Sequence, residues 1–589
     1  MRIKIFRLIV VISFLLITMD LVYIQVIRGS YFYNLSKNNR IRAVAIEGER
    51  GRIFDRHGVV LADNRRAFDV MVVPQGIEDQ DELFDFLSKI LEIDKKKLQK
   101  IYRQKAFGPF APIAVAEDIS REKTIVLEEN KFRFPGLYVQ ESFRRFYPPM
   151  DASSHVLGYV RKISPEKLEA LRDYGYTPQS VAGETGVEES YDRYLRGQPG
   201  GLQLEVNSRG EQVRLLSMKE PLKGQDITLT IDHRIQQIAA ELLADRTGAI
   251  IVMDMNSGEI LGLVSSPSFD PNIFIENNKR STQDIFADRR SPFLNRAISG
   301  QYPPGSAFKI PVALCALDAR KINSATTFNC PGYFKLGEKE FQCSHTHGDQ
   351  NLIEAITHSC NVYFFHVGLM VGSEMIQHYA RLLGLGSSTG IDLPSEGKGF
   401  IPSRQQRKIQ RHQGWYAGDT LNLAIGQGEV LATPLQLVRM MSIVAQNGRD
   451  VHPHVVKAVG SLDRPFPEPF SLEDITDPQM KINEYLRPRF IHINDGKFFE
   501  TVQTGLRATV TDPSGTASVL NIPNLLVSGK TGTAQTTKNR DHHAWFIGFC
   551  PSSKVNIAFC VFLEYGGSSY NACVVARDLL LRMQAEGIL

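Results

Sequence analysis

The sequence has almost no excess of charge of either sign. Its 68 lysine and arginine residues are nearly balanced by 64 acidic residues, which leaves a formal net charge of +4 over 589 residues. An excess this small gives no reason to expect nucleic-acid binding. The chain also lacks a phosphate-cradling glycine-rich loop and an obvious internal repeat, so neither a P-loop nucleotide site nor a repeat architecture is indicated. The length indicates two or more domains.

Cysteine is scarce, and its distribution is uneven. All seven cysteines lie between residues 315 and 573. An odd number is awkward for a simple disulfide framework outside the cytoplasm. Four of them lie in apolar helix or strand patterns and are interpreted as packed core thiols: Cys315, Cys550, Cys560 and Cys573.

The N-terminus carries a long apolar run, residues 8–27, which Asp20 interrupts. About twenty residues at 1.5 Å each span a bilayer. No small-x-small cleavage site follows, so we expect a retained signal anchor rather than a removed signal peptide. The basic residues before the run, Arg2, Lys4 and Arg7, place the N-terminus in the cytoplasm and the bulk of the chain outside it. Asp20 fits either the outer interface or a contact with a partner helix.

One short segment has the residue types of a nucleophile and its base. A Pro-Pro-Gly turn at residues 303–305 precedes an apolar run, Ala307–Leu317, which predicts a buried helix whose first turn carries Ser306. Ser306 and Lys309 are three residues apart and therefore share a helix face. A lysine can take a serine proton where burial or a nearby cation lowers the pKa of its amine. The helix start also offers N–H groups to a developing oxyanion.

The Ser-x-x-Lys pattern alone recurs by chance, and two further motifs strengthen the assignment of Ser306 and Lys309. Ser359-Cys360-Asn361 and then Lys530-Thr531-Gly532-Thr533 follow in order along the chain. The three motifs together resemble the set that marks penicillin-recognising serine enzymes.

Segments before residue 230 resemble the non-catalytic region of one branch of that family, the class B penicillin-binding proteins. Arg50–Ala62 is similar to the opening signature R-G-x-I-x-D-R-x-G-x-x-L-A, and Arg145–Pro148, His155–Val160 and Gly183–Glu188 resemble later signatures. Within this branch, Trp415–Thr420 and Ile425–Gly428, with Thr433-Pro434, resemble the elongation-type, penicillin-binding protein 2 subfamily. The resemblance covers nearly the whole chain. None of the early segments contains a recognisable nucleophile–base pair, so we interpret them as a pedestal with a docking surface.

The predicted fold class is multidomain α/β (α+β). Residues 1–28 form a cytoplasmic tip and transmembrane anchor, and residues 29–225 form a β-rich, dimerisation-type pedestal with a small α/β insert at about 79–135. Residues 226–589 form the transpeptidase domain, an antiparallel sheet assembled from both ends of the segment and covered by helices. Three late strands (525–536, 543–550 and 555–565) and a closing helix (572–585) complete it, with Lys530 and Thr533 on an edge strand. A bifunctional glycosyltransferase domain and C-terminal wall-binding repeats are not expected.

The resemblance implies a two-step acyl transfer on stem peptides that end in D-Ala-D-Ala. Ser306 attacks, Lys309 takes its proton, Ser359 relays protons to the leaving amine, and Asn361 binds the substrate amide and Lys309. Lys530, Thr531 and Thr533, in the Lys-Thr-Gly segment with Gly532, bind the terminal carboxylate, and the N–H groups of Ser306 and Thr533 form the oxyanion hole. β-Lactams resemble the substrate and are expected to acylate Ser306 and remain bound.

The remaining cysteines suggest a second site. Cys330 and Cys343 lie in turns, and with Cys360 and His347 they offer three sulfurs and one imidazole, a set that structural zinc favours. The middle residue of Ser-Cys-Asn should point away from the substrate, so Cys360 is placed to brace the motif from behind. A Cys330–Cys343 disulfide is the alternative, and His345 is the alternative ligand. The transfer chemistry itself requires no cofactor.

We therefore expect a single-pass inner-membrane D,D-transpeptidase that cross-links peptidoglycan during cell-wall elongation. A pedestal without a polymerase domain implies a SEDS-family (RodA-like) glycan polymerase as partner. The alternatives are a division-specific class B transpeptidase, a D,D-carboxypeptidase or lactam hydrolase, and a lactam-sensing receptor. The sequence does not indicate which diamino acid supplies the acceptor amine.

Overall fold

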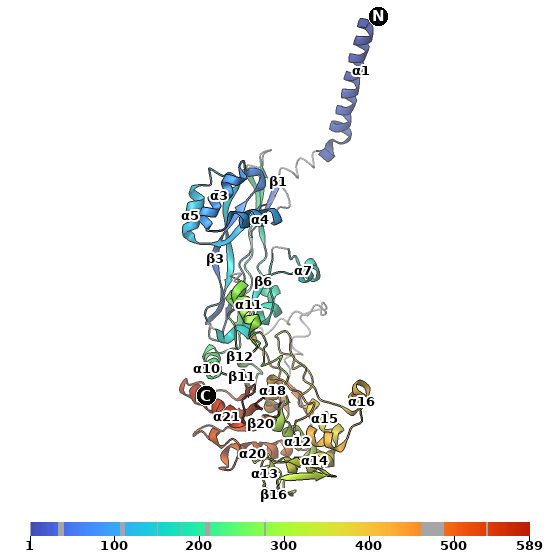
Figure 1. Ribbon diagram of the computed structural model, residues 1–589, viewed down its shortest axis with the longest axis vertical. Coiled ribbons are helices and arrows are strands. Elements are labelled where there is room, and N and C mark those ends of the chain that lie inside the picture. The colour runs from blue at the N-terminus through green and yellow to red at the C-terminus, as the bar shows by residue number, and fades with distance from the viewer. Residues whose placement is uncertain are drawn as a thin grey trace. The chain divides into compact units, whose positions relative to one another are not determined.

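The computed structural model describes residues 2–32, 41–46, 48–105, 112–149, 151–177, 180–206, 212–275, 279–460, 488–536 and 540–589 (Figure 1). The chain forms two compact units. The first contains residues 1–51, 64–144 and 196–224, and the second contains residues 52–63, 145–195 and 225–589.

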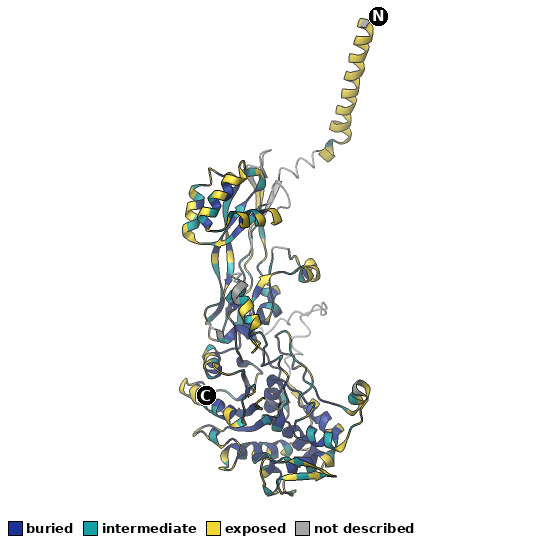
Figure 2. Cartoon of the chain, viewed as in Figure 1, coloured by how far each residue is buried: buried dark blue, intermediate teal, exposed yellow. Residues whose placement is uncertain are grey.

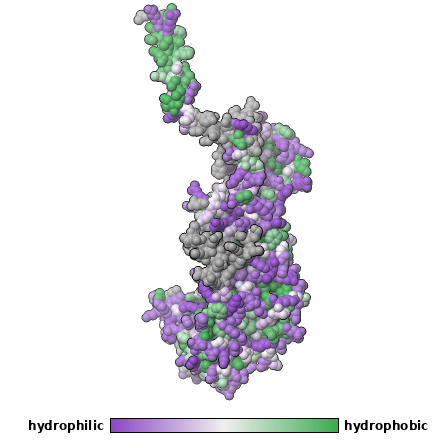
Figure 3. Space-filling model, turned by 180° about the vertical axis from the view of Figure 1, so that it is seen from behind, coloured by the Kyte–Doolittle hydropathy of each residue, from purple (hydrophilic) through white to green (hydrophobic). Residues whose placement is uncertain are grey.

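The N-terminal helix is the membrane-anchor candidate. Helix α1 (Arg2–Val22) continues into a π-helical turn, η1 (Tyr23–Ile27). Residues 3–27 are 25 residues long, and within the described part of the chain they form the one helix long and apolar enough to cross a membrane. Their side chains are exposed, and most of their surface is hydrophobic (Figures 2 and 3).

The rest of the first unit contains a three-stranded sheet and part of a six-stranded sheet. One has the antiparallel order β1-β8-β9, formed by Ile41–Ile46, Gly200–Val206 and Gln212–Lys219. In the other, the later part of β3 (Val60–Val72) pairs with β4 (Ile113–Ile119) and β5 (Leu137–Phe146). Helices α3 (Gln80–Leu91), α4 (Lys95–Lys105) and α5 (Arg121–Glu129) share a core with this second sheet.

Helix α3 shows how the sequence directs this packing. The Asp79 side chain accepts a hydrogen bond from the Glu82 N–H and caps the helix, as Asp commonly does at an N-terminus. Leu83, Phe84 and Leu87 recur at helical spacing and are all buried. The amphipathic pattern therefore fixes which helix face meets the sheet.

The centre of the second unit is a five-stranded antiparallel sheet in the order β12-β11-β22-β21-β20. The outer strands are β12 (Ile260–Ser266) and β20 (Ser528–Ala534), and the inner strands are β11 (Gly248–Asp254), β22 (Ile557–Leu563) and β21 (His543–Cys550). The sheet thus joins two early strands to three late ones, as the sequence predicted. Strand β20 lies at the edge of the sheet, also as predicted.

Alternate residues of each strand enter two different cores. Ile250 and Val252 face the core formed with α10 (His233–Leu243) and α21 (Ser569–Ala585). Ile251 and Met253 face the larger core, which contains α12 (Lys309–Asp318) and α18 (Pro434–Ala445). Both faces of the sheet are covered, which explains why its inner strands β11, β22 and β21 are largely apolar. The closing helix begins three residues earlier than predicted, because Ser568 accepts a hydrogen bond from the Tyr570 N–H and caps it there.

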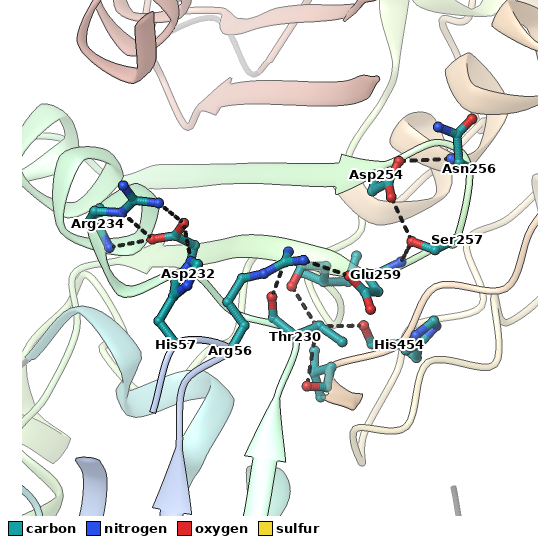
Figure 4. Close-up of polar contacts among 12 residues, drawn as sticks. Arg56, His57, Thr230, Asp232, Arg234, Asp254, Asn256, Ser257, Glu259 and His454 are labelled. Carbon is teal, nitrogen blue, oxygen red and sulfur yellow. Dashed lines mark hydrogen bonds and ion pairs between the residues drawn. The ribbon is translucent and has the colours of Figure 1, made fainter. Parts of the chain in front are cut away.

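Polar side chains of residues 55–57 hold residues 52–63 against other parts of the second unit (Figure 4). Strand β2 (Ile53–Phe54) pairs in parallel with β10 (Ile227–Leu229). In the turn that follows, Arg56 pairs with Glu259 at 3.1 Å and His57 Nε2 lies 3.1 Å from an Asp232 oxygen. Asp232 also caps α10 by accepting the Arg234 N–H. These side chains are used for packing, in agreement with a non-catalytic role for the segment.

Candidate active site

Ser306 lies on a tight turn that leads into a buried helix. Residues Gly305–Phe308 form a 3₁₀ turn, η6, and α12 starts at Lys309. The sequence predicted an α-helix from Ala307, and the difference has a local cause. Pro311 has no N–H to donate to the Ala307 carbonyl, so regular α-helical hydrogen bonding cannot include that residue. The half-buried Ser306 therefore sits on the turn, and Lys309 begins the helix.

The buried amine of Lys309 joins two of the three motifs. Its side chain is 1% exposed, and Nζ donates to the Ser359 carbonyl at 2.7 Å, to Ser359 Oγ at 3.2 Å and to Asn361 Oδ1 at 2.7 Å. Burial lowers the pKa of Lys309 from 10.5 to about 8, against the opposing influence of Cys343 and Cys360. A lysine with this pKa has a substantial neutral fraction near pH 8, as a general base requires.

Ser359 has a strained backbone that determines where its side chain points. Its φ is +57°, in the left-handed region that non-glycine residues seldom occupy. It lies between α13 (Leu352–Thr357) and α14 (Asn361–Val371). Such strain in a non-glycine residue is often found at functional sites, and here it accompanies the contact between Ser359 and Lys309.

The third motif lies on edge strand β20. Lys530 is fully buried, and burial followed by the charge of Lys309 lowers its pKa well below 10.5. Thr531 Oγ1 lies 2.9 Å from Thr516 Oγ1. A Cβ on Gly532 would lie 2.9 Å from the Pro304 carbonyl oxygen, so this strand closely approaches the turn that carries Ser306. The structure thus places Lys530–Thr533 beside that turn.

The cysteine–histidine cluster predicted from the sequence is assembled behind the Ser-Cys-Asn motif. Cys330, Cys343, His347 and Cys360 each offer one ligand atom, and these atoms lie within 4.8 Å of one another. His347 Nδ1 is 3.4 Å from the Cys330 sulfur and 3.6 Å from the Cys343 sulfur. Tetrahedral zinc with ordinary bond lengths separates nitrogen and sulfur ligands by about 3.5 Å and two sulfurs by about 3.8 Å. The donor set therefore suits zinc, and the two nitrogen–sulfur distances match those that zinc would impose.

The structure distinguishes the alternatives for these residues. All seven cysteines are free, so the Cys330–Cys343 disulfide is not formed. His345 is not in the cluster, and its carbonyl oxygen approaches Cys330 instead. A hydrogen bond with Cys360 lowers the pKa of the Cys343 thiol against the opposing effect of burial, whereas the same contact and burial raise the pKa of Cys360. The pair thus favours a thiolate at Cys343, the form of cysteine that binds metals.

This cluster is connected to the catalytic motif through Asn361. The Asn361 N–H donates to the Cys343 sulfur at 3.1 Å, while Asn361 Oδ1 accepts from Lys309. The Tyr363 N–H donates to the Cys360 sulfur at 3.4 Å. Cys360 therefore faces away from Lys309, whereas its two neighbours in the motif face toward it.

Two residues near the site were not identified from the sequence. Thr516 contacts Thr531, and Gln427 Nε2 donates to the Thr533 carbonyl at 3.2 Å. Gln427 lies in Ile425–Gly428, which had served only to indicate the subfamily. No local pattern marked Thr516, because its role depends on a contact with a distant strand.

Comparisons with known proteins agree with this geometry. Residues 248–580 match the penicillin-binding protein transpeptidase domain, and residues 45–229 match the penicillin-binding protein dimerisation domain. The peptidoglycan D,D-transpeptidase MrdA of Acinetobacter baumannii is 32% identical over 97% of this chain and 85% of its own length. MrdA of Escherichia coli K12 is 30% identical over 95% of this chain and 90% of its own length.

Solved structures extend the similarity to the fold. The complex between penicillin-binding protein 2 (PBP2) and MreC from Helicobacter pylori contains a chain with a TM-score of 0.80 and 28% identity, matched over 93% of this chain and 100% of that chain. A peptidoglycan synthase complex that coordinates polymerization and crosslinking contains a chain with a TM-score of 0.70 and 29% identity, matched over 99% of this chain and 98% of that chain.

These findings confirm the predicted fold class and enzyme class. The N-terminal apolar helix fits a single-pass membrane anchor, and the transpeptidase chemistry of this family needs no cofactor. The chain belongs to the class B penicillin-binding proteins, in the PBP2/MrdA group of peptidoglycan D,D-transpeptidases that act in cell elongation.

Proposed function

We propose that Ser306 is the acylated nucleophile and that Lys309 is its base. The observation that carries the proposal is the set of three hydrogen bonds from the Lys309 amine to Ser359 and Asn361. These bonds bring two motifs 50 residues apart to one buried amine. The close approach of β20 at Gly532 adds the third motif to the same turn.

In the first step, Ser306 Oγ bonds to the carbonyl carbon between the two D-alanines while its proton passes to neutral Lys309. The tetrahedral intermediate then collapses, the carbon–nitrogen bond breaks, and D-alanine leaves with a proton relayed through Ser359. N–H groups of Ser306 and Thr533 stabilise the oxyanion, a contribution of about 3–4 kcal/mol per donor in well-studied enzymes. Asn361 holds the substrate amide and Lys309.

In the second step, an amine of a neighbouring stem peptide attacks the acyl-enzyme carbonyl. Lys309 takes a proton from that amine, and Ser306 leaves and regains a proton as the cross-link forms. Before D-alanine departs in the first step, Lys530, Thr531 and Thr533 bind its carboxylate, with the hydroxyl groups as donors. The Lys-Thr-Gly-Thr strand thus selects peptides that end in a free carboxylate.

Mass spectrometry after penicillin treatment tests the assignment. The adduct is expected on the peptide that contains Ser306 and should disappear in Ser306→Ala. Ser518→Ala, which changes an exposed serine elsewhere in the same unit, should keep it. An adduct on any other residue contradicts the proposal. Incubation with two labelled stem peptides should give a cross-linked dimer, whereas a carboxypeptidase or hydrolase would release D-alanine without one.

Cys330, Cys343, His347 and Cys360 hold a structural zinc that fixes the back of the Ser-Cys-Asn motif. The support is that the four ligand atoms lie within 4.8 Å of one another and that the Asn361 N–H donates to the Cys343 sulfur. When bound, the metal supplies charge neutralisation and cross-linking, not catalysis. Elemental analysis of the purified protein should find one zinc per chain, and zinc removal should expose three additional titratable thiols. Metal-free protein that lacks two free thiols contradicts this site.

The partner is a SEDS-family (RodA-like) glycan polymerase, and the support is the similarity of this chain to a chain of a peptidoglycan synthase complex. The N-terminus lies in the cytoplasm, and the support is the position of Arg2, Lys4 and Arg7 before the apolar helix. Residues 1–28 form the anchor, residues 29–225 the pedestal that docks the partner, and residues 226–589 the transpeptidase domain. Co-purification should be lost when the pedestal is replaced by that of a division-type relative. Unchanged co-purification contradicts the docking role.

A further inference from the structure

Two backbone segments closely approach the turn that carries Ser306, and glycines allow these contacts. The Gly305 N–H donates to the Gly426 carbonyl at 3.0 Å. A Cβ on Gly426 would lie 2.2 Å from the Gly305 oxygen, and a Cβ on Gly305 would lie 2.7 Å from the Thr533 oxygen. The loop after α17 (Ala417–Ala424) and strand β20 therefore enclose the turn from two sides.

The Thr533 carbonyl points toward this junction and not into the sheet. Thr533 lies opposite Ala544 in the antiparallel pair of β20 and β21. Gln427 Nε2 donates to the Thr533 oxygen at 3.2 Å, so that oxygen faces away from β21. The N–H and C=O groups of one residue in an extended strand point to the same side. The Thr533 N–H therefore also faces the turn that carries Ser306.

We propose that Gln427 is a positioning residue for the oxyanion hole. Its side-chain amide holds the Thr533 carbonyl and thereby fixes the orientation of that residue on strand β20, which has no further strand on its outer side among the described residues. Gly426, the adjacent residue, holds the turn that carries the second donor, the Ser306 N–H. One short loop thus sets the relative position of both oxyanion donors. This inference rests on the proposed role of Ser306 and extends it to a residue outside the three motifs.

Gln427→Leu removes the amide donor with a similar side-chain volume. Stopped-flow acylation by a chromogenic cephalosporin separates the acylation rate constant from the dissociation constant of the initial complex. We expect the rate constant to fall about tenfold, the effect of one lost hydrogen bond, with the dissociation constant unchanged. A boronic acid analogue of acyl-D-alanine, whose adduct places a hydroxyl in the oxyanion hole, should bind about tenfold more weakly.

Gln503→Leu is the matched control, because Gln503 Nε2 also donates to a backbone carbonyl, that of Val444, at 2.7 Å. It should lower thermal stability and leave both kinetic constants unchanged. Gln427→Glu adds a pH readout. Its protonated carboxyl can donate to the Thr533 oxygen and its ionised form cannot, so its acylation rate relative to the wild type should rise as the pH falls.

The outcomes separate this inference from the proposed function. If the wild type is acylated at Ser306 and the acylation rate constant of Gln427→Leu is within twofold of the wild-type value, only the role of Gln427 is overturned. The role of Gln427 is also overturned if Gln427→Leu changes only the dissociation constant of the initial complex. Equal decreases of the acylation rate constant in Gln427→Leu and Gln503→Leu overturn it as well. A wild-type adduct on a residue other than Ser306 overturns the proposed function itself.

Discussion

The pKa of Lys309 gives a quantitative prediction for the pH dependence of acylation. At a pKa of about 8, the neutral fraction of the amine is about one-eleventh at pH 7 and about ten-elevenths at pH 9. The acylation rate constant should therefore rise about tenfold between these values. An unperturbed lysine would be almost fully protonated throughout. The difference between 10.5 and about 8 corresponds to about 3 kcal/mol.

The same pKa makes stability depend on pH with a defined sign. Because the folded pKa lies below the unfolded one, the unfolded chain binds more protons between pH 8 and 10.5. Stability should therefore rise with pH across this window, and below it the full cost of a buried ammonium is present. Cys343 and Cys360 raise the pKa of Lys309.

The assay is the acylation rate constant at saturating β-lactam, measured from pH 6.5 to 9.5. Saturation separates the effect of Lys309 titration from that of Lys530. Loss of the Lys530 charge should weaken carboxylate binding and leave the rate constant at saturating β-lactam unchanged. Lys309→Arg keeps a cation that cannot lose its proton and should slow acylation at least about a hundredfold. A flat profile between pH 7 and 9, or an apparent pKa near 10.5, refutes the reasoning.

Three substitutions test other parts of the structure. Cys343→Ser should reduce bound zinc below half an equivalent and slow acylation, whereas zinc content unchanged from the wild type contradicts its role as a ligand. Glu188→Gln should lower the free energy of unfolding in urea by about 3 kcal/mol, because the buried Arg145 loses its counter-charge at 2.6 Å; an unchanged midpoint would show that the pair is unimportant. Gly426→Ala should cut acylation by at least about tenfold, since its Cβ would lie 2.2 Å from the Gly305 oxygen, and wild-type kinetics would exclude so close an approach.

Local patterns predicted the elements that depend on nearby residues. The strands of the central sheet follow from short apolar runs separated by turns, and the cap and apolar spacing of α3 within the predicted insert are equally local features. The catalytic motifs were identified by resemblance, and their convergence was an expectation until the contacts of Lys309 were seen. The 3₁₀ turn at Ser306 was missed, although Pro311 could have indicated it.

Long-range contacts account for what the sequence did not reveal. Residues 52–63 and 145–195 belong to the same compact unit as residues 225–589, because strand β2 pairs with β10 across 174 positions (Ile53 with Ile227). Gln427 and Thr533, 106 residues apart, meet through one side-chain hydrogen bond. Local sequence patterns do not indicate such a pairing, because neither residue lies in a pattern that points to its distant partner.

The geometry of the Ser-Cys-Asn motif has several independent supports. The left-handed conformation of Ser359 costs about 1–2 kcal/mol, and the surrounding contacts must maintain it. The Cys360 N–H donates to the Ala355 carbonyl at 2.9 Å, and the Cys360 sulfur caps α14 through the Tyr363 N–H. The Asn361 N–H also donates to the Cys343 sulfur. The backbone that follows Ser359 in the chain is therefore held by hydrogen bonds to two cysteine sulfurs. The cysteine cluster thus helps to hold Ser359 and Asn361 against the Lys309 amine.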